Sequence, residues 1–91
     1  MYKIIHSNKF LKDLKRCKKR GLNENDLLKV IKILAAGEKL PEKYKDHQLH
    51  GTMAKYRECH ISPDWLLIYE KRKNELIIYL VTTGSHSDLF R

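Results

Sequence analysis

This 91-residue sequence lacks the features of membrane-spanning, exported and repetitive proteins. No apolar run reaches the roughly 18–20 residues that a membrane-spanning helix needs. The first ten residues, MYKIIHSNKF, lack the long apolar core and the small-residue cleavage site of a signal peptide. No segment repeats, and none has a linker-like composition. We therefore expect a single domain over residues 1–91 that is cytoplasmic and has no membrane partner.

Cysteine is scarce, and the two cysteines lack the spacing of a redox or metal motif. Cys17 and Cys59 form no C-x-x-C pair, and in a reducing compartment such residues are usually small buried hydrophobes. The histidines invite a metal site, but His47, His50 and His60 lack the second paired ligand motif that zinc sites usually show. The sequence therefore predicts no disulfide, no metal site and no cofactor.

Acidic residues are few relative to basic ones. Eleven Asp and Glu stand against nineteen Lys and Arg, which gives a net charge of +8 with neutral histidines. Such an excess does not fix the fold, but it favours a polyanionic partner, either a nucleic acid or an acidic protein. A basic surface that is merely solvated is the alternative.

The apolar pattern predicts two helices near the N-terminus. After MYKII, which is typical of a short strand, apolar residues recur at helical spacing over residues 8–20, with Ser7 as the N-cap. A second helix is expected over residues 23–37, capped by Asn23 and ended by Gly37. The first helix carries seven cations on its polar face: Lys9, Lys12, Lys15, Arg16, Lys18, Lys19 and Arg20.

The second half of the chain predicts a β-meander. The segments AKYRECHI, WLLIYEK and LIIYLVT are typical strands, with turns at SPD and RKNE. Two helices packed on such a sheet give an α+β fold with a small, mostly antiparallel sheet. In a meander, the end of one strand, the start of the next and the end of the third lie at the same edge. That edge should gather His60, Asp64, Trp65 and His86.

These residue types suit the cleavage of RNA without a metal. The reaction needs a base for the 2′-OH proton, an acid for the departing 5′ oxygen and a cation for the charged phosphorane. Histidine, with a free pKa near 6.5, can be acid or base at neutral pH, and an aromatic ring can stack on an unpaired base. Any one histidine at a sheet edge could instead be structural. A serine nucleophile in SHSD is not expected, because sequence neighbours rarely meet in triad geometry.

Three segments carry a resemblance to a known family. LPEKYKDHQLHG, YRECHISPDWLLIY and TGSHSDLF together resemble the YafQ branch of the RelE/ParE superfamily of bacterial type II toxins, and the resemblance covers the whole chain. It implies a RelE-like fold, a ribosome-dependent endoribonuclease that cuts mRNA in the A site, and inhibition by a cognate antitoxin. The positions that match the active-site motif of the family are His47, His60, Asp64, Trp65, His86 and Phe90.

The resemblance and the expected chemistry together give these residues roles. His86 is expected to be the general acid, and Asp64 or His47 the base. His60 would position the site or support charge, and Trp65 with Phe90 would shape the pocket and its stacking face. The candidate phosphate contacts are Lys45 and Arg57, and His50 is a possible auxiliary because it lies in the matching loop.

One position departs from the family pattern. Where the family commonly has Arg before TGSH, this chain has Thr82. Losing a preorganised charged donor typically costs roughly 2.7–4 kcal/mol of transition-state stabilisation, about 10²–10³ in rate. Three interpretations stay open: another cation such as Lys45 or Arg57 contacts the phosphate, the nuclease is weakened, or the change is inactivating.

Two rival functions fit the same resemblance. A ParE-like protein would poison DNA gyrase, although the histidine cluster argues against that reading. A non-catalytic RNA-binding or repressor subunit would act only with its antitoxin. In each case a basic surface would favour an antitoxin with a disordered acidic segment that folds on binding.

Overall fold

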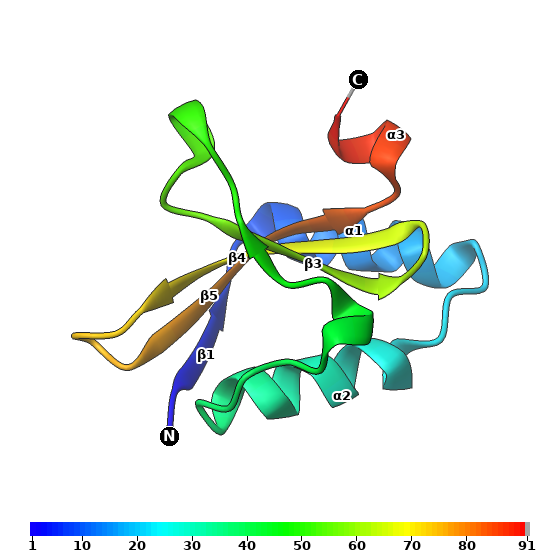
Figure 1. Ribbon diagram of the computed structural model, residues 1–91. Coiled ribbons are helices and arrows are strands. Elements are labelled where there is room, and N and C mark those ends of the chain that lie inside the picture. The colour runs from blue at the N-terminus through cyan, green and yellow to red at the C-terminus, as the bar shows by residue number, and fades with distance from the viewer. Residues whose placement is uncertain (91) are drawn as a thin grey trace.

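The computed structural model describes residues 1–90 and shows helices packed around one mixed sheet (Figure 1). The predicted α+β, RelE-like fold is confirmed. In chain order the elements are β1 (Lys3–His6), α1 (Asn8–Lys19), α2 (Glu24–Ala35), the 3₁₀ turn η1 (Glu42–Tyr44), β2 (His47–Gln48), the 3₁₀ turn η2 (Gly51–Met53), β3 (Arg57–Ser62), β4 (Trp65–Arg72), β5 (Ile77–Gly84) and α3 (His86–Leu89).

The helices begin where the sequence predicts. The Ser7 hydroxyl accepts a hydrogen bond from the Phe10 amide at 2.9 Å, and the Asn23 side chain accepts one from the Asn25 amide at 2.9 Å. These caps satisfy amides that have no partner inside the helix. None of the helices within residues 1–90 is long and apolar enough to cross a membrane.

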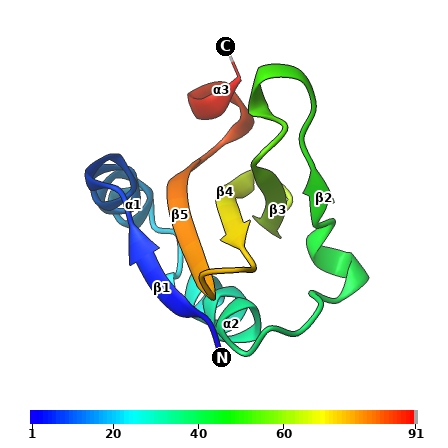
Figure 2. The same ribbon diagram turned by 90° about the vertical axis from the view of Figure 1, so that its left-hand side faces the viewer.

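The sheet has the strand order β1-β5-β4-β3-β2 (Figure 2). β1 pairs parallel with β5, and the remaining neighbours are antiparallel, so the predicted meander of β3, β4 and β5 is present. The largest departures from the sequence prediction lie before β3 and after β5. β3 begins at Arg57 because η2 occupies residues 51–53, and the segment after β5 forms a helix, α3, that periodicity did not predict.

The two faces of the sheet have different environments. One face, called the helix face below, packs on the helices, and its buried residues include Cys59, Leu67 and Tyr69 against Phe10 and Val30. Because residues paired across antiparallel strands share a face, the register places a second set of side chains on the opposite face. This opposite face, called the site face below, carries His47, Glu58, His60, Leu66, Ile68 and Thr82.

A bulge in β5 decides which face Thr82 occupies. Leu80 pairs with Tyr69, but Thr82 pairs with the next residue, Ile68, so Val81 has no partner. The extra residue turns the strand, so that Leu80 stays in the core while Thr82 joins the site face. Strict alternation would have put Leu80 and Thr82 on the same face.

Helix α1 lies along the edge of β5 where β1 has ended. β1 pairs with β5 only as far as Leu80. Beyond that point the Ser7 hydroxyl donates to the Val81 carbonyl at 2.7 Å, and the Arg16 guanidinium donates to the Thr83 carbonyl at 3.3 Å. These side chains satisfy carbonyls that would otherwise form an open sheet edge. One stripe of α1 therefore lies beside the site face.

Candidate active site

Two histidines of the site face share one buried carboxylate. Oε1 of Glu58 lies 3.5 Å from Nε2 of His47 on β2 and 3.5 Å from Nε2 of His60 on β3. Nδ1 of His47 donates to the Lys45 carbonyl at 2.7 Å, which fixes the ring and directs Nε2 toward Glu58. The Glu58 side chain is only 8% exposed. The carboxylate therefore lies beside both imidazoles on the same face of the sheet and would pair with either ring in its protonated form.

Glu58 is a residue that the motif reasoning missed. The signal was in the sequence, because Glu58 and His60 are two residues apart in a predicted strand and must share a face. The short strand β2, which pairs His47 with Glu58, is only two residues long and leaves no alternating pattern in the sequence. Only the pairing of β2 with β3 shows that His47 lies beside the Glu58 carboxylate.

The expected convergence at the strand edge is present for Asp64, His86 and His60. Oδ1 of Asp64, in the turn before β4, accepts the His86 amide at 3.0 Å and lies 2.6 Å from Nδ1 of its ring. The hydrogen bond from the His86 backbone, followed by that from its ring, lowers the pKa of Asp64, so the carboxylate is ionised at neutral pH. The rings of His60 and His86 meet edge to face, with centroids 5.6 Å apart.

His86 is positioned with one ring nitrogen available. Its Nδ1 is taken up by Asp64, which leaves Nε2 as the nitrogen that can act on a ligand. The side chain is 53% exposed at the start of α3, so a substrate can reach it. A carboxylate that orients a histidine in this way is a recurring arrangement in acid–base catalysis.

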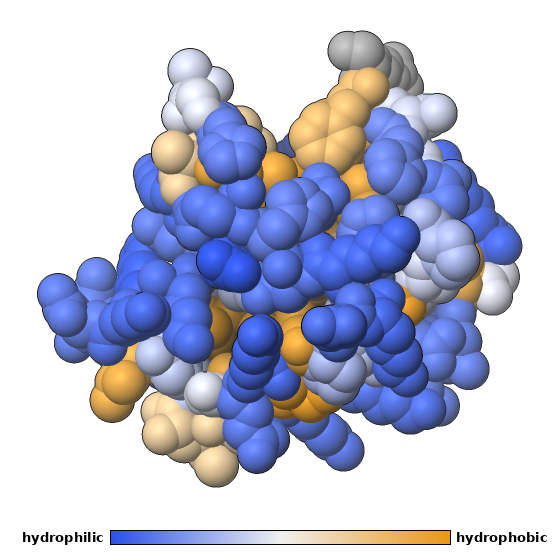
Figure 3. Space-filling view, in the orientation of Figure 1, coloured by the Kyte–Doolittle hydropathy of each residue, from blue (hydrophilic) through white to orange (hydrophobic). Residues whose placement is uncertain are grey.

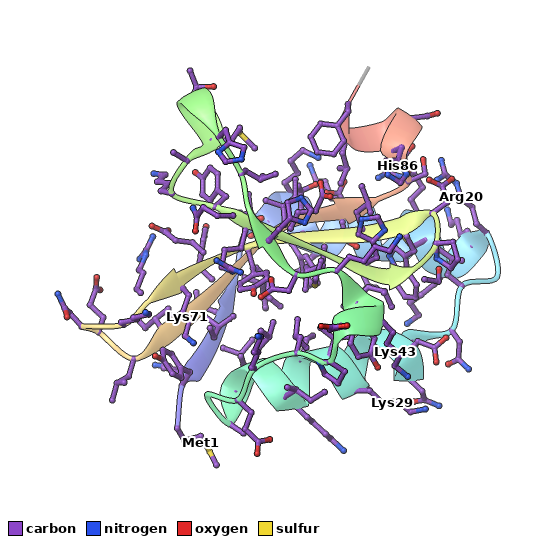
Figure 4. All side chains as sticks on the ribbon, in the orientation of Figure 1. Met1, Arg20, Lys29, Lys43, Lys71 and His86 are labelled. Carbon is purple, nitrogen blue, oxygen red and sulfur yellow. The ribbon has the colours of Figure 1, made fainter. Side chains whose placement is uncertain are left out.

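Helix α3 is short, and contacts with α1 hold it. Ser85 and Asp88 form a reciprocal capping box, in which each side chain accepts the other's backbone amide. Asp88 also binds Arg20 through two hydrogen bonds of 2.6 and 3.1 Å, and Arg16 lies 3.6 Å from it. Figure 4 shows Arg20 and His86 at the same end of the molecule. The helix that carries His86 is thus tied to α1.

The Arg20–Asp88 pair predicts a pH-dependent order of α3. Hydrogen bonds from Arg20, then from the Ser85 amide, hold the pKa of Asp88 well below its usual range. Its contribution to stability is therefore complete above the unfolded pKa, near 3.9, and is lost as the pH falls from there toward the folded value. In Asp88→Asn we expect the amides of Leu89 and Phe90 to exchange about fivefold to tenfold faster near pH 6, as for loss of a helix cap.

Hydrogen exchange, corrected for intrinsic rates, measures this at each pH. The difference between wild type and Asp88→Asn should shrink as the pH falls below about 4, because the Asp88 carboxyl of the opened helix takes up a proton there while the clamped one stays charged to lower pH. Ser87→Ala, on the exposed side of the same helix, is the matched control and should exchange like wild type. A difference that persists unchanged at low pH would contradict a charge-based clamp.

Trp65 does not lie where a stacking platform would. It is 1% exposed and belongs to the core of the helix face. Its indole Nε1 donates to the Thr83 hydroxyl at 2.9 Å, and that hydroxyl donates to the Leu66 carbonyl at 2.6 Å. The indole is therefore a buried connection between β4 and β5, and a nucleobase cannot stack on it in this position.

Arg57 and Thr82 are also placed differently from the expectation. Arg57 points to the helix face, where Asp46 binds its guanidinium at 3.0 Å. Thr82 is on the site face but only 8% exposed, and its hydroxyl donates to Asp13 of α1. The same hydroxyl accepts from Lys9 Nζ at 3.1 Å. Arg57 is therefore bound to Asp46 on the helix face, away from the site face. Thr82 lies where the sheet meets α1.

The remaining expected residues border the site from two sides. Lys45 lines a pocket with Lys29, Lys43 and His60 beside the last residues of β3, and Figure 4 shows Lys29 and Lys43 on that side of the molecule. Phe90, which ends α3, is 48% exposed. Figure 3 shows the surface hollowed between the loop that carries η2 and the α3 end of the chain. His50, just before η2, makes no side-chain cap to that turn.

The chemistry of this cluster comes from imidazoles and carboxylates. Two histidines and Glu58 lie on the sheet, and His86 faces them from α3, held by Asp64 of the turn between β3 and β4. Within residues 1–90, no group of three or more His, Cys, Asp or Glu side chains is arranged to hold a metal ion. The arrangement can donate one proton and accept another on either side of a bound phosphate.

Comparison with known proteins gives consistent matches over the whole chain. The profile of the family described as "Bacterial toxin of type II toxin-antitoxin system, YafQ" matches residues 2–91. The mRNA interferase toxin YafQ of Escherichia coli K12 is 36% identical over 88 residues, which cover 96% of this chain and 94% of that protein.

Solved structures give the same result. The toxin in the E. coli DinJ–YafQ complex superposes with a TM-score of 0.91 at 35% identity, with 100% of each chain covered. A metal-bound toxin from Helicobacter pylori superposes with a TM-score of 0.92 at 48% identity, covering 99% of this chain and 100% of that one.

Proposed function

This chain belongs to the YafQ family of bacterial type II toxins, and from that premise we propose that it inhibits translation by cutting mRNA in the ribosomal A site. The observation that carries the proposal is the pairing of His86, oriented by Asp64, with His60 on the facing strand. The E. coli relative is an mRNA interferase, which supports the same activity here. Because this activity needs ribosomes, we propose that the protein acts in the cytoplasm.

The reaction we propose is a metal-independent transfer within the RNA backbone. A base takes the proton of the 2′-OH, the 2′ oxygen forms a bond to phosphorus, and the bond from phosphorus to the 5′ oxygen breaks. His86 gives its Nε2 proton to the departing 5′ oxygen. The products are a 2′,3′-cyclic phosphate and a 5′-hydroxyl. The exposure of His86 and its bond to Asp64 support its role as the acid.

The base is assigned to His60 rather than to Asp64. The Asp64 oxygen nearest the site is occupied by His86, which suits a positioning residue. His60 is near enough to His86 for both rings to border one phosphate, and Glu58 orients it from behind. His47, on the other side of Glu58, would support charge at the same carboxylate.

The test is to map RNA ends on ribosomes programmed with a defined mRNA. Wild type should produce one cut within the A-site codon, with a cyclic phosphate and a 5′-hydroxyl. The same mRNA without ribosomes should stay intact. A parallel supercoiling assay with DNA gyrase covers the ParE-like alternative. Intact mRNA on ribosomes together with inhibited gyrase would reject the nuclease in favour of that alternative.

A cognate antitoxin with an acidic segment is the proposed inhibitor. The E. coli relative has been crystallised in a DinJ–YafQ complex, and the net charge of +8 suits an acidic segment that folds on binding. A purified antitoxin with such a segment should bind the protein and stop cleavage. Raising the salt concentration should weaken this binding if charge dominates it.

A further inference from the structure

The strands themselves supply no cation to the site face near the proposed reaction. Cleavage through a phosphorane needs a positive group close to the oxygens on which negative charge develops. Arg57, the arginine of β3, points to the helix face and is bound there by Asp46. On the site face the register places His47, Glu58 and His60 on one side of Ile68 and Thr82 on the other.

Helix α1 supplies what the strands lack. Lys9, Asp13 and Arg16 follow one another at helical spacing, and this stripe lies against the end of β5. Asp13 is buried, with a side chain that is 4% exposed, and it accepts from the Thr82 hydroxyl. Lys9 Nζ is 3.0 Å from Asp13 and 3.1 Å from the Thr82 hydroxyl.

Lys9 and Arg16 differ in how many protein groups bind their charged ends and in how exposed their side chains are. Arg16 donates to the Thr83 carbonyl, pairs with Asp13 at 3.4 Å and lies 3.6 Å from Asp88, so it serves the contact between α1 and α3. Lys9 has contacts only at its ammonium end, and its side chain is 65% exposed. A lysine is a mobile point charge, so its ammonium can turn from Asp13 toward an arriving phosphate.

We propose that Lys9, from α1, is the cation that contacts the RNA phosphate at the Thr82 side of the site. Thr82 and Asp13 position its ammonium beside the sheet. The Thr82 side and the Glu58 side of the site face are close together. Thr82 on β5 and Glu58 on β3 both pair with Ile68 of β4, so their Cα atoms are about 10 Å apart. This inference rests on the proposed nuclease function and names a residue that no sequence motif indicated.

Lys9→Gln is the variant that isolates the charge. Glutamine can still donate hydrogen bonds to Asp13 and Thr82, so the fold should be kept, and thermal unfolding checks this. On programmed ribosomes, the single-turnover cleavage rate should fall about 10–100-fold, as expected for the loss of one charged contact in the transition state. Lys9→Arg should retain the rate within a few-fold.

Lys12→Gln is the matched control, because it removes one positive charge from the exposed side of the same helix. Ribosome binding, measured with an A-site codon blocked by 2′-O-methyl groups, should be similar for Lys9→Gln and Lys12→Gln. Only Lys9→Gln should lose cleavage. Equal losses in both variants would show that general positive charge, rather than Lys9, is responsible.

Thr82→Arg gives an independent test in both backgrounds. If Lys9 supplies the cation, Thr82→Arg should restore part of the rate in the Lys9→Gln background, because it returns a positive charge to the same place beside Asp13. A large gain in the wild-type background would show that the native site lacks a cation and would overturn the inference. Cleavage by Lys9→Gln at the wild-type rate would also overturn it. If wild type itself leaves programmed mRNA intact, the proposed function fails first, and this inference fails with it.

Discussion

Replacing His86 with alanine is expected to lower the rate of mRNA cleavage on programmed ribosomes by about 10²–10⁴-fold, the range for loss of a general acid. The folded state should be unaffected. The His86 ring is more than half exposed, and its backbone amide can still donate to Asp64. Thermal unfolding and ribosome binding should therefore match wild type.

A modified substrate identifies the step in which His86 acts. When sulfur replaces the 5′ oxygen at the scissile position, the leaving group departs as a thiolate and needs little help from an acid. His86→Ala should cut this substrate at nearly the wild-type rate, whereas His60→Ala should stay slow on both substrates. Ser87→Ala serves as the control from the same helix. Equal losses by His86→Ala on both substrates would show that His86 does not protonate the leaving group.

The second large effect is expected at Trp65, and it concerns stability. Truncation of a buried tryptophan to alanine typically costs about 3–5 kcal/mol, against a total stability of about 5–15 kcal/mol for a domain. Trp65→Ala should therefore unfold at much lower urea concentrations or fail to accumulate. The cause is the cavity left beside Leu67 in the core and the loss of the hydrogen bond to Thr83.

Trp65→Phe distinguishes a structural role of Trp65 in the core from a direct contact with RNA. Phenylalanine refills most of the cavity but leaves the Thr83 hydroxyl without its indole donor, so we expect a smaller loss of about 1–3 kcal/mol. Each folded molecule should still cut mRNA at nearly the wild-type rate. A variant that is as stable as wild type but no longer cleaves would instead place the indole in the site.

Much of the fold followed from local signals. The caps at Ser7 and Asn23 fix the helix starts by satisfying free amides, and the alternation within β3 and β4 places one set of side chains in the core. The meander also placed Asp64 and His86 at one edge before any tertiary contact was known. These features depend on nearest neighbours along the chain or on the short turns between strands.

The errors concerned residues whose surroundings come from distant segments. The family resemblance gave Trp65 a role in the pocket and its stacking face, yet the packing of the helices makes it a core residue. Arg57 looked free because its partner, Asp46, belongs to a loop eleven positions earlier. Thr82 stands where the family commonly has Arg, and the sequence could not show that its hydroxyl donates to Asp13 of α1.

The sequence by itself determined the α+β class and the family, since hydrophobic period, turn residues and motif order are written along the chain. The tertiary structure alone decided how charges and hydroxyls are paired. A one-residue bulge at Val81 turns Thr82 onto the site face, and the path of α1 along β5 brings Lys9 to it. The physical reason is that side-chain alternation is local, whereas a bulge and a helix docked on a strand edge depend on packing between segments more than seventy residues apart.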